Sequence, residues 1–333
     1  MAESLTVLPS DLEPSERGSF QGHGSLKLAF ARWEHPEPKG RVVISHGYGE
    51  HGERYRHTAK WLHSLGWSVS SMDHAGFGRS EGTRGDATGI RPFADDFAFF
   101  LHQERLHDAI RNGAHPRLVD EVPVLSWPVL PQVVLGHSFG GLVAMLACLW
   151  HPDAVDGLVL SSPAVSLRPL TGLMKWMGSV LFRLAPHLSI DLPGNKNLVC
   201  SDPVLVQRYW ADPYCHRRVT ASFPVAIQEG REELLTFGSE LDRPMLLLEA
   251  DIDTVVDPDG AEAIWSSIKP GLLERHRMNG FYHEVFHDIH RAEAQALVEP
   301  WLETMYRTWM AANAPIPMPM EATPDSLPPA IAV

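Results

Sequence analysis

The sequence predicts an α/β fold in which helices cover both faces of a mostly parallel sheet. Five short apolar runs, rich in Val, Ile and Leu, alternate along the chain with longer helical patterns. Runs that are apolar throughout are typical of strands buried on both faces, because a strand with one face in water alternates apolar and polar residues. The alternation of such strands with helices indicates a doubly wound α/β layout.

Each expected element has a place in order along the chain. The expected strands are Arg41–Ser45, Ser68–Met72, Gln132–Leu135, Gly157–Ser161 and Met245–Glu249, followed by one in the segment LLERHRM at 272–278. The expected helices are residues 54–65, 92–112, 139–150 and 289–312.

The spacing of these elements divides the chain into a core and an insertion. Residues 21–163 and 241–313 carry the alternating pattern and are expected to form the core. Residues 164–240 contain no clear strand but several Trp, Met and Phe residues, so we expect a helical cap over the carboxyl edge of the sheet. Residues 1–20 are polar and are expected to form an arm. Residues 314–333 are rich in Pro and are expected to be a disordered tail.

Composition and charge exclude several classes of protein. Of the 333 residues, 44% are hydrophobic and 21% are charged, which leaves enough apolar material for a sizeable core. The net charge of −13 argues against a nucleic-acid binder, whose surface would carry a basic patch. Three widely spaced cysteines without a C-x-x-C pair indicate neither a disulfide framework nor a thiolate zinc site. With no secretion signal and no apolar run of membrane-spanning length, we expect a soluble, cytoplasmic protein.

The most informative segment is GHSFG, which follows the QVVL run and precedes an apolar helical pattern. A G-x-S-x-G motif between a strand and a helix is the nucleophile elbow, a strained turn that lifts the serine hydroxyl above the sheet. Gly136 and Gly140 suit this turn because neither has a Cβ that would collide with Ser138 or the neighbouring helix. The motif alone is weak, but its strand–turn–helix context predicts that Ser138 is a nucleophile.

A serine nucleophile needs a base, and the base needs an acid that orients it. In this architecture the acid follows the serine and precedes the histidine along the chain. Three acids after the MLLLEA strand compete for the role, namely Asp251, Asp253 and Asp257.

The base is expected in the loop before the last helix. His283 follows a turn that contains Gly280, which places it to reach over the sheet edge. His287 and His290 are alternatives, but both lie at the start of the final helix, where a surface or helix-terminal role is expected.

Two backbone N–H groups should stabilise the oxyanion that forms in acyl transfer. One is expected from Phe139, the residue after the nucleophile, and the other from Tyr48 in the loop after the first core strand. That loop also contains His46 and His51, which we interpret as structural residues that hold backbone carbonyls. Their spacing does not indicate a metal site.

These motifs together resemble the monoglyceride lipase and lysophospholipase branch, serine aminopeptidase S33-like, of the α/β-hydrolase superfamily. The matching segments are SHGYGEHGERY at 45–55, DHAGFGRSEGTRG at 73–85, GHSFGG at 136–141, ADIDTVVD at 250–257 and GFYHEVFHD at 280–288. The resemblance implies the α/β-hydrolase fold with a helical cap. It also implies a triad of Ser138, Asp253 and His283, with oxyanion donors at Tyr48 and Phe139.

The resulting hypothesis is a serine carboxylic-ester hydrolase that cleaves single-chain esters, such as monoacylglycerols or lysophospholipids, through an acyl-enzyme. No cofactor, metal or nucleic-acid partner is expected. The alternatives are an aminopeptidase or thioesterase on the same fold, and a non-catalytic binding protein. Such a binding protein would normally have lost a triad residue.

The cap contains one segment whose pattern supports two interpretations. Residues 170–184 carry an apolar stripe at helical spacing, and Trp176 and Phe182 project away from that stripe. This surplus fits a lid that contacts a membrane or micelle transiently. A cap helix buried on two sides explains the pattern equally well, so both interpretations stay open.

Overall fold

A computed structural model describes residues 11–112, 117–119, 122–124, 130–168, 172–191 and 199–312. The expected tail, residues 314–333, and the first ten residues of the expected arm lie outside the described residues.

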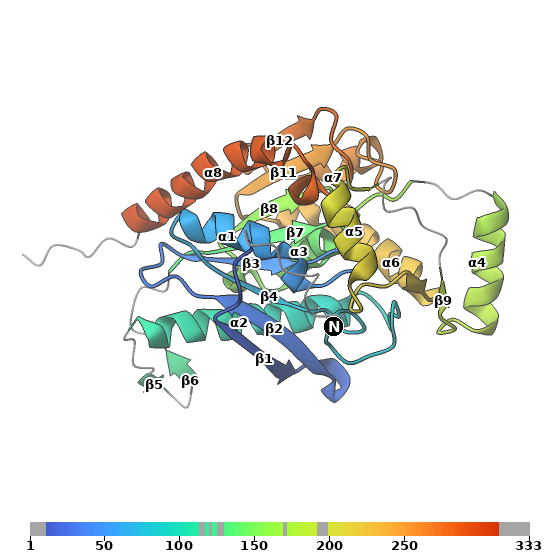
Figure 1. The fold of residues 1–333 in the computed structure, drawn as a ribbon, viewed down its shortest axis with the longest axis horizontal. Coiled ribbons are helices and arrows are strands. Elements are labelled where there is room, and N and C mark those ends of the chain that lie inside the picture. Colours follow the sequence, from blue (N-terminus) through green and yellow to red (C-terminus); the bar gives the residue numbers. More distant parts are fainter. Residues whose placement is uncertain are drawn as a thin grey trace, which may run out of the picture.

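One eight-stranded sheet organises the fold, in the order β1-β2-β4-β3-β7-β8-β11-β12 (Figure 1). Its strands are β1 (Glu16–Gln21), β2 (Lys27–Trp33), β3 (Arg41–Ser45), β4 (Ser68–Met72), β7 (Gln132–His137), β8 (Gly157–Ser161), β11 (Met245–Ala250) and β12 (Leu273–Met278). β2 is antiparallel to both of its neighbours, and the other pairs in this sheet are parallel. The predicted, mostly parallel sheet is therefore confirmed.

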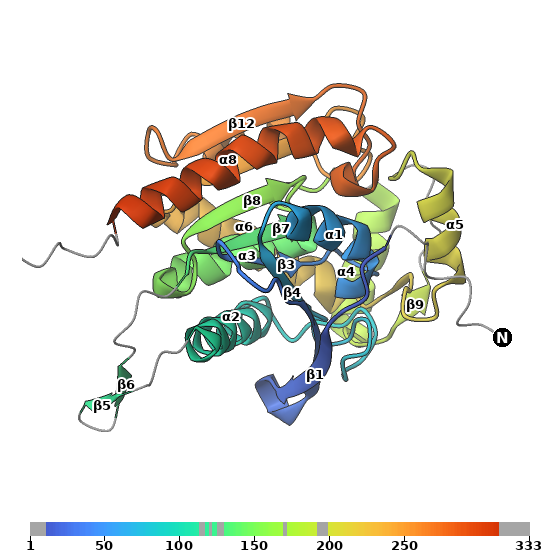
Figure 2. The same cartoon turned by 60° about the vertical axis from the view of Figure 1, so that its left-hand side comes forward.

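Helices cover both faces of this sheet. The helices are α1 (Arg56–Ser64), α2 (Arg91–Arg111), α3 (Phe139–Trp150), α4 (Gly172–Leu184), α5 (Pro203–Ala211), α6 (Ser222–Phe237), α7 (Glu262–Trp265) and α8 (Arg291–Ala312). One apolar cluster joins the sheet to α1 and α8, and the other joins it to α2, α3, α6 and α7. In Figure 2, α1 and α8 lie in front of the strands, and α3 and α6 are seen behind them.

Smaller elements complete the chain. The short 3-10 helices are His23–Ser25, Gly52–Tyr55, Pro152–Ala154, Gly238–Glu240, Asp259–Ala261 and Val285–His287. Two-stranded ribbons pair β5 (Arg117–Val119) with β6 (Val122–Val124), and β9 (Ile190–Asp191) with β10 (Arg218–Val219).

The strand β3 shows why an apolar run forms a central strand here. Val43 packs in the cluster with α2 and α3, whereas Val42 and Ile44 point to the opposite face and pack with α1 and α8. Since successive side chains of a strand point to opposite faces, a strand covered on both sides needs apolar residues at every position.

The two antiparallel strands β1 and β2 were not among the expected elements, and β1 corrects the predicted arm. Residues 16–20 were expected in the arm but belong to the sheet edge. Phe20 is the one buried residue of β1, so the strand has no apolar run to detect. In β2 the pattern is broken by Arg32, whose buried guanidinium forms an ion pair with Glu104 at 2.6 Å.

The insertion after β8 is also shorter than residues 164–240. Its last helix, α6, packs against α3 and buries Phe223, Ala226 and Leu234 in the main apolar cluster. α6 is therefore a helix of the core. The other two helices of the insertion, α4 and α5, extend away from the core. α4 lies at the right-hand edge of Figure 1. Within the described residues, no helix is long and apolar enough to cross a membrane.

Candidate active site

The predicted nucleophile sits in a strained turn between β7 and α3. Ser138 has φ +52° and ψ −120°, a backbone conformation that residues with a side chain rarely adopt. Its N–H donates to the carbonyl of Ser161 at 3.0 Å, which holds the turn against the neighbouring strand β8. A Cβ on Gly140 would lie 2.1 Å from the carbonyl oxygen of Ser45, so only glycine fits there. This is the local geometry of a nucleophile elbow.

The structure brings the three residues predicted for the triad together. His283 Nε2 lies 2.8 Å from Ser138 Oγ, and His283 Nδ1 lies 2.7 Å from Asp253 Oδ2. Ser138 follows β7, Asp253 follows β11 and His283 follows β12, so all three stand at the carboxyl edge of the parallel strands. Their exposed fractions are 6%, 3% and 5%.

Burial and hydrogen bonding distinguish Asp253 from the other two acids. Asp251 is exposed and Asp257 is half-buried, and the bond to His283 comes from Asp253. The other carboxylate oxygen of Asp253 accepts the N–H groups of Val255 and Val256, both at 2.8 Å. Burial alone would raise the pKa of Asp253, but the charge and hydrogen bond of His283 and the two N–H groups lower it. Asp253 is therefore ionised and fixed against the imidazole.

The loop after β3 is held by a buried carboxylate. Glu50 Oε1 accepts the N–H of Gly47 at 2.7 Å and the hydroxyl of Tyr55 at 2.8 Å. These bonds fix the loop that carries the N–H of Tyr48. Phe139 is the first residue of α3, and the first N–H groups of a helix have no partner within it. Both predicted oxyanion donors thus lie on backbone whose course is set by local contacts.

A buried ion network joins this loop to the loop of His283. Arg54 pairs with Glu50 and, at 3.2 Å, with Glu284, and all three side chains are at most 6% exposed. The sequence analysis did not predict this network, although two of its members lie in the GEHGERY segment and the third follows His283. The acids and the arginine of these two motifs are the signal that could have indicated it.

The loop after β3 also carries His46 and His51, and both were predicted to hold backbone carbonyls. His46 is structural as expected, since its ring contacts the carbonyl of Gly47 at 2.8 Å and accepts the N–H of His74 at 3.0 Å. His51 holds a side chain instead of a backbone carbonyl, because its Nε2 lies 2.9 Å from Asp212 Oδ2 in the insertion.

His290 is exposed as expected, but the expected surface role of His287 is wrong. The His287 side chain is buried, and its ring packs edge-on against Tyr55 with ring centroids 4.7 Å apart. It lies in the short 3-10 helix Val285–His287 that precedes α8, which turns it inward.

Comparison with known proteins places this site in a family. Residues 36–290 match the family described as serine aminopeptidase, S33. The chain belongs to this family, and with it to the monoglyceride lipase branch of the α/β-hydrolases, so the protein is a hydrolase.

Two curated relatives cover most of the chain. It is 28% identical over 287 residues to a monoacylglycerol lipase of Mycolicibacterium smegmatis, covering 85% of this chain and 95% of that protein. It is also 28% identical over 293 residues to the human monoglyceride lipase, covering 86% of this chain and 90% of the relative.

Solved structures give the same fold. A monoacylglycerol lipase of Paleococcus ferrophilus is 26% identical with a TM-score of 0.69, covering 84% of this chain and 99% of its own. A soluble variant of the monoglyceride lipase of Saccharomyces cerevisiae has a TM-score of 0.76 at 18% identity, covering 90% of this chain and 98% of its own. At this low identity, the yeast structure supports the fold and nothing further.

Proposed function

We propose that this hydrolase cleaves carboxylic esters with Ser138 as nucleophile, His283 as base and Asp253 as orienting acid. The observation that carries the proposal is the unbroken chain of hydrogen bonds from Ser138 Oγ through the His283 imidazole to Asp253, at 2.8 and 2.7 Å. Both distances are within reach of proton transfer in the resting site.

The proposed reaction has two halves. Ser138 Oγ attacks the ester carbonyl while His283 Nε2 takes the hydroxyl proton, and the imidazolium then protonates the leaving alcohol. Water, deprotonated by the same nitrogen, hydrolyses the acyl-enzyme and frees the serine. Asp253 holds Nδ1–H throughout and stabilises the imidazolium by its charge. The N–H groups of Tyr48 and Phe139 serve as the oxyanion donors.

Single-chain acyl esters of the monoacylglycerol or lysophospholipid type are the proposed substrates. The two relatives described above are a monoacylglycerol lipase and a monoglyceride lipase, which supports monoacylglycerols as substrates. The insertion adds exposed apolar side chains next to the core, since Phe182 is 41% and Leu184 80% exposed, and Leu188 and Ile190 follow. These residues fit transient contact with a lipid surface. The side chain of Trp176 lies outside the described residues.

A substrate panel tests the proposal. Turnover should be measured on p-nitrophenyl esters of increasing chain length, on monoacylglycerols and on lysophosphatidylcholine, with Ser138→Ala as the blank. Each methylene buried by the acyl chain contributes about 0.8 kcal/mol, so kcat/KM should rise with chain length until the acyl site is filled. A flat or falling dependence would contradict the lipid-ester assignment and favour the aminopeptidase or thioesterase alternative on the same triad.

Covalent labelling tests the nucleophile independently of substrate. A fluorophosphonate should label Ser138 stoichiometrically, because an activated serine beside oxyanion donors attacks phosphorus as it attacks carbon. Ser138→Ala should remain unlabelled, and His283→Ala should label far more slowly because the hydroxyl has lost its base. Mass spectrometry of the labelled peptide identifies the site, and absence of label in the native protein would favour the non-catalytic alternative.

The proposed reaction needs no metal ion, since the carbonyl is polarised by backbone N–H groups. Treatment with EDTA should therefore not lower the rate of ester hydrolysis. Loss of turnover on chelation, restored by zinc, would overturn the mechanism.

A further inference from the structure

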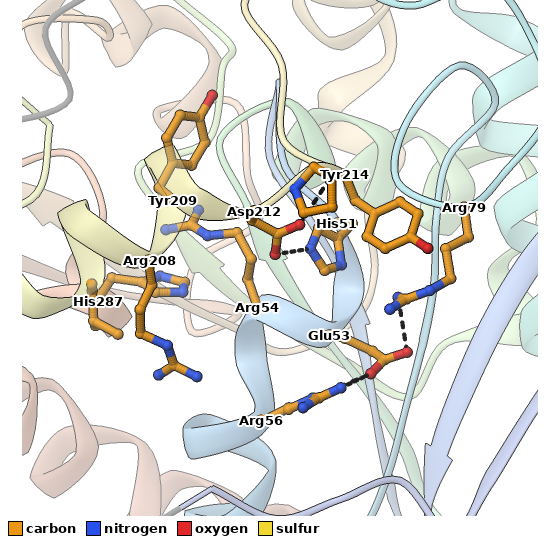
Figure 3. A pocket seen from close by; sticks show the side chains of 12 residues that line it. His51, Glu53, Arg54, Arg56, Arg79, Arg208, Tyr209, Asp212, Tyr214 and His287 are labelled. Carbon is orange, nitrogen blue, oxygen red and sulfur yellow. Dashed lines mark hydrogen bonds and ion pairs between the residues drawn. The ribbon is translucent and has the colours of Figure 1, made fainter. Parts of the chain in front are cut away.

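A polar cavity of about 210 Å³ lies between the core and the insertion (Figure 3). The core contributes the loop around His51 and the start of α1, and the insertion contributes α5 and the loop after it. Four arginines, two acids and two histidines line it, which is unlike the apolar lining expected for an acyl chain.

Two residues that line this cavity, His51 and Asp212, lie close to Cys215, and the three together offer potential metal ligands. A ring nitrogen of His51, a carboxylate oxygen of Asp212 and the sulfur of Cys215 all lie within 4.8 Å of one another. Figure 3 shows His51 and Asp212 joined at this wall, with Tyr214 beside them. Asp212 Oδ1 accepts the N–H of Tyr214 at 2.9 Å, and the N–H of Cys215 donates to the Asp212 carbonyl at 3.3 Å. This turn presents the carboxylate and the thiol together.

His51 has a buried ring nitrogen that can bind a metal ion. Its side chain is 4% exposed, and its Nδ1 is a buried atom without a hydrogen-bond partner within the described part of the chain. The nitrogen of a neutral imidazole is a common zinc ligand.

Two of the arginines that line the cavity, Arg54 and Arg79, are neutralised by carboxylates. Arg54 is paired with Glu50 and Glu284. Arg79 is paired with Glu53 at 2.9 Å, and its guanidinium lies 4.2 Å from the ring centroid of Tyr214.

We propose that His51, Asp212 and Cys215 form a zinc site. Imidazole nitrogen, thiolate sulfur and carboxylate oxygen are all zinc ligands, and three protein ligands with water in the fourth position are common for this ion. The three ligand atoms all lie within 4.8 Å of one another, so small side-chain movements would arrange them around a tetrahedral ion. The cavity supplies the path of entry and the room for the fourth ligand.

Zinc at this site would fasten the insertion to the loop that carries Tyr48. Several contacts already join the two parts, among them the hydrogen bond from the N–H of His216 to the carbonyl of Gly49 at 3.0 Å and the His51–Asp212 pair. A metal ion bonded to both sides would hold the insertion against this loop beside the candidate active site. We therefore expect zinc to inhibit the enzyme reversibly. The inhibition rests on the proposed function, whereas the binding does not.

Cobalt binding tests the site without reference to activity. The reduced full-length protein is titrated with Co²⁺, and a thiolate-to-cobalt charge-transfer band should saturate at one equivalent and be displaced by Zn²⁺. The band should vanish in Cys215→Ser. It should persist in the matched control Cys200→Ser, because Cys200 is not one of the three proposed ligands and its sulfur lies 3.2 Å from the His287 carbonyl. Asp212→Asn keeps the thiol but should weaken Zn²⁺ affinity by more than about tenfold. A band retained in Cys215→Ser, or none in the native protein, overturns the site.

Activity measurements test the consequence. With a p-nitrophenyl ester as substrate, Zn²⁺ should inhibit along the same saturation curve as it binds, and EDTA should restore turnover. Cys215→Ser should hydrolyse the ester normally and resist Zn²⁺. If Cys215→Ser is inhibited like the native protein, the inhibition comes from elsewhere and the regulatory role is refuted. If the native protein shows no ester hydrolysis, the proposed function fails while the cobalt band still decides the site.

Discussion

Asp253 is one of three acids within seven residues, and its environment gives it the place beside His283. Its carboxylate is held on one oxygen by two backbone N–H groups and on the other by the imidazole. The backbone carbonyl of Asp253 also accepts Nε–H of Arg168 at 2.7 Å, so the turn is fixed from the insertion side as well. Asp251, which is exposed, has no such support.

The acid assignment predicts unequal effects of the same substitution at two positions. Asp253→Asn should lower kcat by roughly 10³- to 10⁴-fold, because an amide neither holds the correct tautomer nor stabilises the imidazolium. Asp251→Asn, as the matched control, should change kcat by less than about twofold. Steady-state kinetics on one short ester and circular dichroism of both variants check this. If Asp251→Asn lost most of its kcat while Asp253→Asn kept a near-normal kcat, the assignment would be reversed.

At this scale the sequence predicts the residues that lie in a local motif. Ser138 is fixed by a five-residue pattern and His283 by its place after a glycine turn. The interactions of Glu284 with Arg54 and of His51 with Asp212 join segments far apart in the chain, so no spacing rule reveals them. The surface role predicted for His287 is wrong because the residue was expected within or beside the start of the last helix, whereas it lies in the 3-10 helix Val285–His287 and α8 begins only at Arg291.

At the scale of elements, the central strands could be predicted from the sequence because both of their faces are buried. β3, β4, β7, β8 and β11 are buried along their whole length, and each produces an apolar or small-residue run. The edge strand β1 shows the opposite case, since hydrogen bonding to β2 fixes it without an apolar pattern. α6 was grouped with the insertion because a helix pattern shows that one face is apolar but not which element that face packs against.

The elbow between β7 and α3 predicts a sharp contrast between two glycine substitutions. Gly140→Ala would place a Cβ 2.1 Å from the carbonyl oxygen of Ser45, and backbone cannot move away cheaply. It should lower the free energy of unfolding by about 1–3 kcal/mol and reduce kcat, because the turn must shift.

The matched control is Gly178→Ala in α4, where an added Cβ meets no atom within 4 Å. Alanine there should stabilise the protein by about 0.5–1 kcal/mol, since it removes backbone freedom from the unfolded chain. Urea unfolding and ester kinetics on both variants check the pair. Similar behaviour of the two variants would refute the steric argument for Gly140.

At the scale of the whole molecule, the fold encloses five histidines whose pKa lies below its ordinary value. His46, His74 and His287 are buried, and His57 and His216 are half-buried. Loss of hydration is the largest cause of the lowered pKa in each of them. At these five positions the native state resists taking up protons that the unfolded chain accepts readily.

These histidines predict the direction of the pH dependence of stability. A group whose pKa falls on folding binds its proton more tightly in the unfolded chain, so its contribution is complete above the unfolded pKa and is lost as pH falls. For His57 the pKa moves from 6.5 to about 4. Glu34, whose pKa is lowered to about 2 because His107 and Arg41 outweigh burial, titrates chiefly below this window. Stability should therefore begin to fall near pH 6.5, well above the range in which carboxylates titrate.

Replacing one of these histidines should flatten the curve. Between pH 7 and pH 5, His57 alone should cost the native protein about 2 kcal/mol of unfolding free energy, at 1.36 kcal/mol per pKa unit. His57→Gln keeps a side-chain donor for the Phe286 carbonyl, which His57 Nε2 contacts at 2.9 Å, but cannot be protonated. Urea unfolding at both pH values should show that this variant loses about 2 kcal/mol less than the native protein. The exposed His290→Gln should behave like the native protein, and an equal acid loss in all three proteins would show that the burial of His57 is not a source of the pH dependence.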